Sequence, residues 1–193
     1  MDLEIFQPGI RPFNAMPHQT LYYQTLQARI RAAVKSIRVC QYVLAVSPSR
    51  PWQRSNKILK DFIDASHRGV ELKVLYDRPK FRSPNLHSNV ASFRILQTKG
   101  ISVRCLSITK TLHIKLIIID DSVFFAGSHN LTNQSLYSPF ELSWECSDPY
   151  MVNAAAIYFD CLFNGSMSEP YADAFKVIQN GNRYKSADPD RSC

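Results

Sequence analysis

The sequence is poor in features that would direct a protein into a membrane or out of the cell. No apolar run approaches bilayer-spanning length, and the opening MDLEIFQPG carries acidic residues where a signal peptide carries basic ones. The five cysteines show no C-x-x-C spacing, and four of them lie in apolar segments. We therefore expect a cytoplasmic protein with reduced cysteines and no stable membrane insertion.

The sequence also lacks modules for target recognition. Its 193 residues contain no internal repeat, low-complexity tract, zinc-finger spacing or helix-turn-helix signature. The length suits one domain with a sizeable core and is short for two. If the protein acts on a specific macromolecule, a partner protein is therefore expected to select it. Such a partner could be a helicase, an ATPase or a defence-system subunit.

What the sequence does have is an excess of positive charge, with a formal net charge of +7. A surface of this sign attracts polyanions, above all nucleic acid. A solvated helix face followed by a basic loop would give the same count, so charge alone does not decide between the two. Between residues 50 and 82 the cations outnumber the four acidic side chains and are Arg50, Arg54, Lys57, Lys60, Arg68, Lys73, Arg78, Lys80 and Arg82.

Hydrophobic spacing predicts an alternation of helices and strands. Helix crossovers between the early strands predict a largely parallel sheet, while a short turn at Asp120, Asp121 and Ser122 predicts an antiparallel hairpin within it. The expected helices span about 19–36, 55–69, 88–100 and 149–163, with Ser55 as the cap of the second. The expected strands span about 37–46, 70–76, 101–106, 113–119, 123–126 and 139–146.

The predicted architecture is therefore an α/β fold, an α-β-α sandwich with a central mixed, mainly parallel sheet flanked by helices. Residues 1–17, which contain three prolines, are predicted to be an irregular lead-in. Residues 18–166 are predicted to form the folded domain. Residues 167–193 are predicted to be a C-terminal extension that becomes a loose tail from about residue 180.

Polar residues gather at the open end of the predicted hairpin. His113 and Lys115 share one face of the first strand, about 7 Å apart. Opposite residues in the hairpin should have numbers that sum to about 241 or 242, which returns Ser128 and Asn130 beside His113. Gly127 has no side chain to block a ligand. Such a rim would receive an anion, and a histidine there can act as nucleophile, base or acid.

The same polar residues also fit roles that involve no anion. The polar alternates of a strand commonly face solvent. A metal site could be built from His113, His129, Asp120 and Asp121, although Lys115 stands where a further ligand would help. Four aromatic residues could either stack on nucleobases or pack in the core, namely Trp52, Trp144, Tyr22 and Tyr23.

The full pattern H-x-K-x4-D-x6-G-S-x-N resembles the HKD signature of the phospholipase D superfamily. Similarity to elements of that family extends over roughly residues 18–165, including AAVKSIRVCQYVL and ASHRGVELKVLYD. Downstream, Ser135 and Glu141 match the family's S-x-x-x-N-x-E continuation, whereas Pro139 occupies its asparagine position. The motif positions are filled by His113, Lys115, Asp120, Gly127, Ser128 and Asn130.

The resemblance implies a phospholipase D-like catalytic domain that needs no metal or other cofactor. In this family a motif histidine attacks phosphorus and forms a covalent phosphohistidine, so His113 would be the nucleophile. A second motif histidine protonates the leaving oxygen. Because this chain has one motif, the resemblance implies a homodimer with His113 from each subunit facing across a two-fold axis. His129 is expected to face solvent or the edge of the substrate.

The resemblance also assigns roles to the other motif residues. Lys115, Ser128 and Asn130 would bind the phosphate. Asp120 would anchor the backbone near the turn, and Glu141 would accept a hydrogen bond from His113 and orient its ring.

Small single-motif relatives resemble dimeric nucleases, which together with the charge favours nucleic acid as the substrate. We predict an endonuclease that cleaves DNA, with RNA as the alternative nucleic-acid substrate. Its backbone-binding surface is expected to include Arg78, Lys80 and Arg82. One alternative is a phospholipid hydrolase that works at a membrane surface. Another is a nucleic-acid-binding or scaffold module that keeps the fold without turnover.

Overall fold

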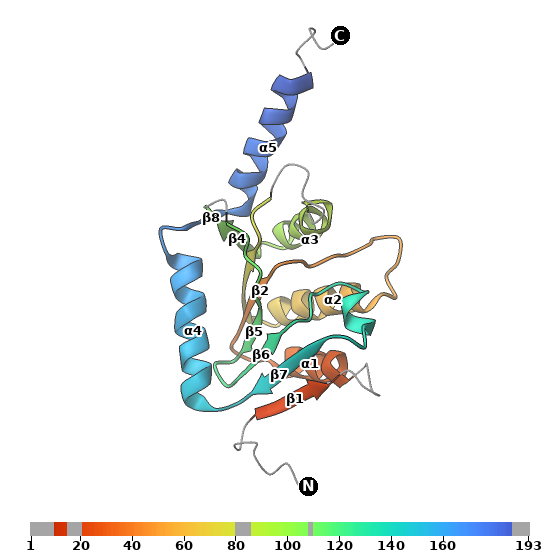
Figure 1. The fold of residues 1–193 in the computed structure, drawn as a ribbon, viewed down its shortest axis with the longest axis vertical. Coiled ribbons are helices and arrows are strands. Elements are labelled where there is room, and N and C mark those ends of the chain that lie inside the picture. The colour runs from red at the N-terminus through yellow and green to blue at the C-terminus, as the bar shows by residue number, and fades with distance from the viewer. Residues whose placement is uncertain (1–9, 15–20, 80–85, 108–109, 187–193) are drawn as a thin grey trace.

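An eight-stranded sheet runs through the molecule in the order β1-β7-β6-β5-β2-β3-β4-β8 (Figure 1). The computed structural model describes residues 10–14, 21–79, 86–107 and 110–186, so Lys80 and Arg82 lie outside the described residues. The strands are β1 (Ile10–Asn14), β2 (Ser36–Gln41), β3 (Glu71–Tyr76), β4 (Ser102–Leu106), β5 (Lys115–Ile119), β6 (Val123–Gly127), β7 (Leu142–Cys146) and β8 (Ser168–Pro170). The helices are α1 (Leu21–Ala32), α2 (Arg54–His67), α3 (Leu86–Thr98), α4 (Pro149–Asn164), α5 (Tyr171–Ser186) and the short 3₁₀ helix η1 (Ser135–Tyr137).

The α/β sandwich and its mixed sheet are confirmed, but the sheet is not mainly parallel. Among the described strands only the pairs β2–β3 and β3–β4 are parallel. The remaining pairs are antiparallel. The reason is that the β5–β6 hairpin joins β2 directly, while β1 and β8 add antiparallel strands at the two edges.

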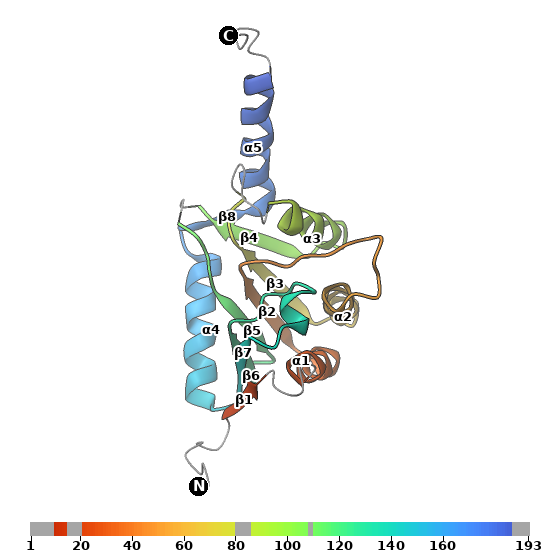
Figure 2. The same cartoon turned by 45° about the vertical axis from the view of Figure 1, so that its right-hand side comes forward.

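Helices cover both faces of the sheet and separate two apolar cores. In Figure 2 α4 lies on one side of the sheet, and α1, α2 and α3 lie on the other. Strand alternation divides β5 between them, because Leu116 and Ile118 pack toward α4 while Ile117 and Ile119 pack toward the helices opposite. Each fully buried isoleucine of this kind contributes about 1.5–3 kcal/mol of burial free energy. Two-sided burial therefore explains why the strand reads as an unbroken apolar run.

The chain ends are more ordered than the sequence predicted. The lead-in over residues 1–17 contains β1, which pairs with β7. Pro12 is compatible with β1 because β1 is an edge strand of the sheet, where a missing N–H costs little. The predicted tail continues as α5 to Ser186, since β8 joins the sheet and Tyr171 and Ala174 are buried in the core. Among the described helices none is long and apolar enough to cross a membrane.

The start of α2 also differs from the prediction. Ser55 does not cap this helix, because the N-cap position is Gln53 and its side chain makes no capping bond. The side-chain oxygen of Asn133 instead accepts a hydrogen bond from the Arg54 backbone N–H at 3.0 Å. The helix end is as expected, because Gly69 follows it with a φ of 92° that only glycine adopts readily. A distant loop therefore takes the place of a local cap.

The β5–β6 hairpin has the register that the sequence predicted. Its pairs run from Leu116↔Ala126 to Ile119↔Val123, so opposite numbers sum to 242. Asp120 and Asp121 form the turn with φ values of 54° and 52°, a conformation that aspartate tolerates better than most residues. The strand β5 begins at Lys115 rather than at His113, and its pairing with β6 begins at Leu116. His113 therefore precedes the strand, at its open end.

Candidate active site

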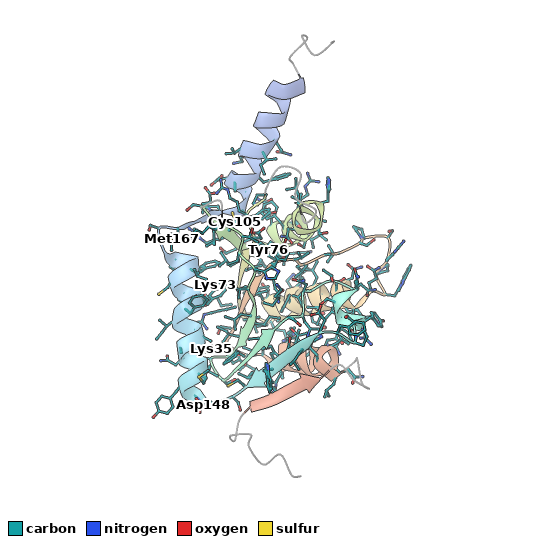
Figure 3. The ribbon with its side chains drawn as sticks, viewed as in Figure 1. Lys35, Lys73, Tyr76, Cys105, Asp148 and Met167 are labelled. Carbon is teal, nitrogen blue, oxygen red and sulfur yellow. The ribbon has the colours of Figure 1, made fainter. Side chains whose placement is uncertain are left out.

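The turn end of the hairpin is closed by hydrogen bonds. The Asp120 carboxylate accepts backbone N–H bonds from Val34 at 3.0 Å, Lys35 at 2.7 Å and Ser36 at 3.0 Å. Asp121 pairs with Lys35, which is labelled in Figure 3, and with Arg38. Five residues of extended strand place Asp120 about 17 Å from Lys115. Asp120 thus makes the anchoring contacts expected of it and lies far from the open end.

The open end presents His113, Lys115 and Tyr42 together. The His113 ring is exposed, and no described residue forms a hydrogen bond with it. Its ring packs edge-on against Tyr42, with centroids 4.8 Å apart. The Lys115 ammonium lies 5.2 Å from the centre of the same Tyr42 ring and donates to the His113 carbonyl oxygen at 2.8 Å. Tyr42 thus holds both motif side chains in place and leaves the imidazole accessible.

A hydrogen-bonded chain links Asn130 to Glu141. The backbone N–H of Asn130 donates to the Ser135 hydroxyl oxygen at 3.0 Å, and that hydroxyl donates to the Glu141 carboxylate at 2.7 Å. The Oδ1 atom of Asn130 is buried without a hydrogen-bond partner. Buried polar atoms are nearly always paired, so an orphaned oxygen at this position marks a place where a ligand or water can bind.

Glu141 reaches this cluster although Pro139 replaces the family's asparagine. The segment after η1 turns, and the Phe140 N–H donates to the Ser138 hydroxyl oxygen at 3.2 Å. Glu141 was expected to accept a hydrogen bond from His113, but its hydrogen bond within the described chain comes from Ser135. Glu141 therefore reaches the site despite Pro139, and its hydrogen-bond partner there is Ser135.

Burial and charge set the protonation of the cluster. Lys115 is 8% exposed, and its desolvation lowers the pKa of the ammonium, an effect that the Glu141 carboxylate partly opposes. The phenol of Tyr22 has its pKa raised by burial first and by Glu141 second. The nearby carboxylate thus favours a charged Lys115 in a site that is partly shielded from water.

His129 was expected to face solvent or the edge of the substrate. It is instead buried, with 2% of its surface exposed. Its ring stacks on Tyr22 with centroids 4.1 Å apart, and its Nδ1 lies 2.8 Å from the Ser143 hydroxyl. Desolvation lowers the pKa of His129 to about 4, with Glu141 opposing the shift. An apolar partner from α1 thus draws the imidazole inward, where it is neutral and fixes the segment between Ser128 and Asn130.

Gly127 and Ser128 bind the neighbouring strand. A Cβ atom at Gly127 would lie 2.3 Å from the Leu142 carbonyl oxygen and 2.4 Å from the Ser143 Cα. The glycine therefore allows close approach of β7, whereas the sequence suggested room for a ligand. The exposed Ser128 accepts from the Leu142 N–H at 2.9 Å through its hydroxyl, which also lies 3.3 Å from the Leu142 carbonyl oxygen. Both residues hold β6 against β7 at the edge of the site.

Most of the predicted basic surface is engaged in internal contacts. Arg54 is 8% exposed, with its guanidinium 3.6 Å from the centre of the Tyr137 ring. Arg68 donates to carbonyl groups at the end of α1, and Arg78 pairs with Glu169 and donates to the Leu106 carbonyl oxygen at 3.2 Å. Lys60 and Lys73, the latter labelled in Figure 3, pair with Asp64 and Glu71. In the described part of this stretch, Arg50 and Lys57 are the cations without such a contact.

The residues of the alternative metal site are not gathered. Asp120 and Asp121 lie at the closed end of the hairpin, His113 lies at the open end, and His129 is buried against Tyr22. Among the described residues no three His, Cys, Asp or Glu side chains come together as metal ligands. The arrangement at the open end is an imidazole and an ammonium that share Tyr42 as a neighbour.

Sequence reasoning missed two residues at the open end, Tyr42 and Gln41. Gln41 is fully buried and is the register partner of Lys115 in β2, and neither its amide oxygen nor its amide nitrogen has a hydrogen-bond partner. Both follow the apolar part of a strand that was predicted to run on to residue 46. A polar and an aromatic residue at the end of a strand were the signal that could have found them.

Comparisons with known proteins identify the family and the fold of the chain. The family model described as "Cardiolipin synthase, PLD-like domain" matches residues 26–163. The curated protein "Phospholipase D Y" of Dictyostelium discoideum is 28% identical over 110 residues, which make up 56% of this chain and 25% of that protein. The chain spans about a quarter of the length of the curated relatives it matches.

Two solved structures share the fold. Nuc from Salmonella typhimurium, described as a phospholipase D family member, aligns with a TM-score of 0.68 and 20% identity over 86% of this chain and 99% of that chain. NucT from Helicobacter pylori aligns with a TM-score of 0.65 and 17% identity over 80% of this chain and 95% of that chain. Identities this low establish similarity of fold.

Proposed function

The chain belongs to the phospholipase D superfamily, and we propose that it is a metal-independent endonuclease that cleaves DNA, with RNA as the alternative nucleic-acid substrate. One observation carries the proposal. The exposed His113 ring has no hydrogen-bond partner within the described chain, and it stands beside the desolvated ammonium of Lys115, with Tyr42 in contact with both. A nucleophile beside a cationic donor for a phosphate is the chemistry that such a rim supports best.

In the proposed reaction a ring nitrogen of His113 attacks phosphorus, the bond from phosphorus to the leaving oxygen breaks, and a phosphohistidine forms. The leaving oxygen takes a proton from His113 of the partner subunit. Water then attacks the phosphohistidine, gives its proton to that second imidazole and releases the first. Lys115 and Asn130 hold the phosphate oxygens as charge develops on them. Ser128 contributes to the same rim, and Glu141 supports Asn130 through Ser135.

Two observations favour nucleic acid as the substrate, namely the net charge of the chain and the extent of its likeness to Nuc. A net charge of +7 suits a polyanionic substrate, and the likeness to Nuc covers nearly the whole of that chain. A second candidate function is hydrolysis of a phospholipid, favoured by the similarity to phospholipase D Y. Both reactions break a phosphodiester bond, so the same motif residues would serve either one.

The test is to incubate the wild-type protein and His113→Ala with single-stranded DNA, duplex DNA, RNA and phosphatidylcholine in excess EDTA. The proposal expects nucleic acid to be cut by the wild-type protein alone. Cleavage that needs added metal, or that persists in the His113→Ala protein, would contradict the mechanism. Turnover of phosphatidylcholine alone would select the second candidate, and no turnover of any substrate would indicate a binding or scaffold module.

The dimer is tested separately by size-exclusion chromatography with light scattering. We expect a two-fold dimer, because one chain supplies one motif histidine for a reaction that needs a nucleophile and an acid. An active protein that stays monomeric at assay concentration would show that the acid comes from elsewhere. A targeting partner, such as a helicase or an ATPase, is proposed on the ground that the sequence shows no recognition module.

A further inference from the structure

Trp52 is a large aromatic side chain that the fold leaves in solvent. It is 66% exposed, whereas the remaining aromatic candidates for base stacking, Tyr22, Tyr23 and Trp144, are buried or half-buried. It lies in residues 47–53, the loop between β2 and α2. Figures 1 and 2 show this connection projecting beyond α2. An exposed tryptophan on a projecting loop has no role in the core and is accessible to a ligand.

The loop is held rigidly by Asn56 from the first turn of α2. The Asn56 side-chain oxygen accepts from the Ser47 N–H at 3.0 Å, and its amide nitrogen donates to the Ser47 carbonyl oxygen at 2.7 Å and to the Arg50 carbonyl oxygen. The Gln53 N–H donates to the Arg50 carbonyl oxygen at 3.1 Å. Trp52 is thus presented on an ordered turn, and little conformational entropy remains to be lost when a ligand binds.

An apolar hollow of about 260 Å³ lies beside this loop, between α2 and α3. Its walls include Pro48 and Pro51 of the loop, Leu59 and Ile63 of α2 and Ile95 of α3. Lys57 lies on its rim. A flat apolar group could therefore enter the hollow while a charged group attached to it stays at the rim.

Two cationic side chains beside the loop are accessible to a ligand. Arg50 and Lys57 are exposed, and neither forms an ion pair within the described part of the chain. Lys60, on the same side of the hollow, is paired with Asp64. Cations beside an aromatic side chain and an apolar hollow match a strand whose bases are apolar and whose backbone is anionic.

The loop is tied at both ends to the chain that follows Asn130. Before it, the Ala45 N–H donates to the Leu131 carbonyl oxygen at 3.0 Å, in a bridge that pairs Leu44 with Leu131. After it, the Arg54 N–H donates to the Asn133 side chain at 3.0 Å. Trp52 is therefore mechanically connected to the segment that carries Asn130.

We propose that Trp52 and the adjoining hollow form a nucleobase-stacking site for a single-stranded segment of the substrate, with Arg50 and Lys57 holding its phosphates. The assignment of the ligand rests on the proposed function. Binding to a membrane surface is less well supported, because interfacial binding buries several apolar side chains and Trp52 is the only large exposed one in residues 47–53. The site would give the enzyme a preference for single strands over duplex, whose bases are already stacked.

The test uses tryptophan fluorescence, because the chain has two tryptophans and Trp144→Phe leaves Trp52 as the sole emitter. In that background, with His113→Ala to prevent cleavage, an oligothymidylate of about 12 nucleotides should quench Trp52 emission on binding. Trp52→Ala should weaken binding of the same strand on the order of 10-fold, measured by anisotropy of a labelled strand, and Trp52→Phe should restore part of the loss. Duplex DNA should be affected much less.

Tyr150→Ala is the matched control, because Tyr150 is 87% exposed and belongs to α4, on the other side of the sheet. Its binding should equal that of the parent protein. Unchanged affinity of Trp52→Ala, or unquenched Trp52 emission in the bound complex, would overturn the stacking site. A blue-shifted Trp52 emission with anionic vesicles but not with oligothymidylate would overturn it in favour of a lipid surface. Cleavage assays of the wild-type protein keep the two proposals apart, since quenching without cleavage upholds this site and rejects the nuclease.

Discussion

The polar side chains at the two ends of the β5–β6 hairpin differ in whether they have hydrogen-bond or ion-pair partners. At the turn, Asp120 receives three backbone N–H groups and Asp121 receives two cations. At the open end, about 17 Å away, the His113 ring and the Asn130 Oδ1 have no hydrogen-bond partner in the described chain. The carboxylates at the turn end of the hairpin thus have partners, whereas the His113 ring and the Asn130 Oδ1 have none in the described chain.

Within one sequence motif, this difference distinguishes polar groups that have partners from polar groups that have none. Burying a polar group without a partner costs about 1–3 kcal/mol, and a ligand at the open end can supply the partner that the Asn130 Oδ1 lacks. The Asp120 end stabilises the connection from α1 to β2, and the His113 ring stays exposed. Motif membership alone does not distinguish the two, because Asp120 and His113 belong to the same pattern.

The largest expected effect is on activity at the open end. Replacing His113 with alanine should lower the rate of phosphodiester cleavage by at least about 10⁴-fold, as loss of a nucleophile does in other enzymes. The free energy of unfolding should change by less than about 0.5 kcal/mol, because the ring is exposed and makes no hydrogen bond in the described chain. Steady-state rates and urea denaturation of the same samples check both. A large loss of stability would mean that this end is structural too.

The next effect is on stability at the turn end. Asp120→Ala should lower the free energy of unfolding by about 3 kcal/mol, because three backbone N–H groups lose a charged acceptor. Asp120→Asn is the control that keeps one acceptor oxygen and tolerates the positive φ, so its loss should be smaller. Urea denaturation gives the ranking. If Asp120→Asn instead abolished cleavage at full stability, Asp120 would have to be counted with the reacting groups.

The smallest effect concerns His129, a polar residue near the open end that is buried and partnered. Its folded pKa of about 4 lies below the ordinary 6.5, so the unfolded chain binds more protons between these values. Stability is therefore lost as the pH falls, by about 2 kcal/mol from pH 7 to pH 5. His129→Phe keeps a ring against Tyr22 and should remove this part of the pH dependence in urea titrations. An unchanged slope would show that His129 is not the group responsible.

The sequence was a good guide to local pairing and a poor guide to distant pairing. The hairpin register followed from the short turn at Asp120 and Asp121, because both strands and their turn are contiguous. The partner of β1 is β7, more than a hundred residues later in the chain, and no local pattern in IRPFN indicates it. The same holds for β8 beside β4, which is why the chain ends were predicted to be irregular.

The same distinction between local and distant contacts applies to the candidate active site. Spacing placed Lys115 beside His113, where the structure has it, whereas the place of Asn130 on the same rim stays a prediction. The structure adds contacts that spacing cannot give. Tyr42 reaches His113 from the end of β2, and Tyr22 draws His129 inward from α1. Gly127 was explained by a ligand, but its neighbour is the Leu142 carbonyl of β7. Contacts between separate elements decide which motif residues are buried in the protein and which stay exposed.

The most direct measurement is the identification of the residue that becomes covalently attached to phosphorus. A reaction of the wild-type protein with a labelled oligonucleotide in EDTA is quenched early under denaturing alkaline conditions and digested with trypsin. We expect one fragment of the labelled strand to be attached through its phosphorus to His113, within the tryptic peptide 111–115, and no such adduct in the His113→Ala protein. Cleavage that proceeds with no adduct on His113, or with the adduct on another residue, would contradict the assignment of the open end as the catalytic end.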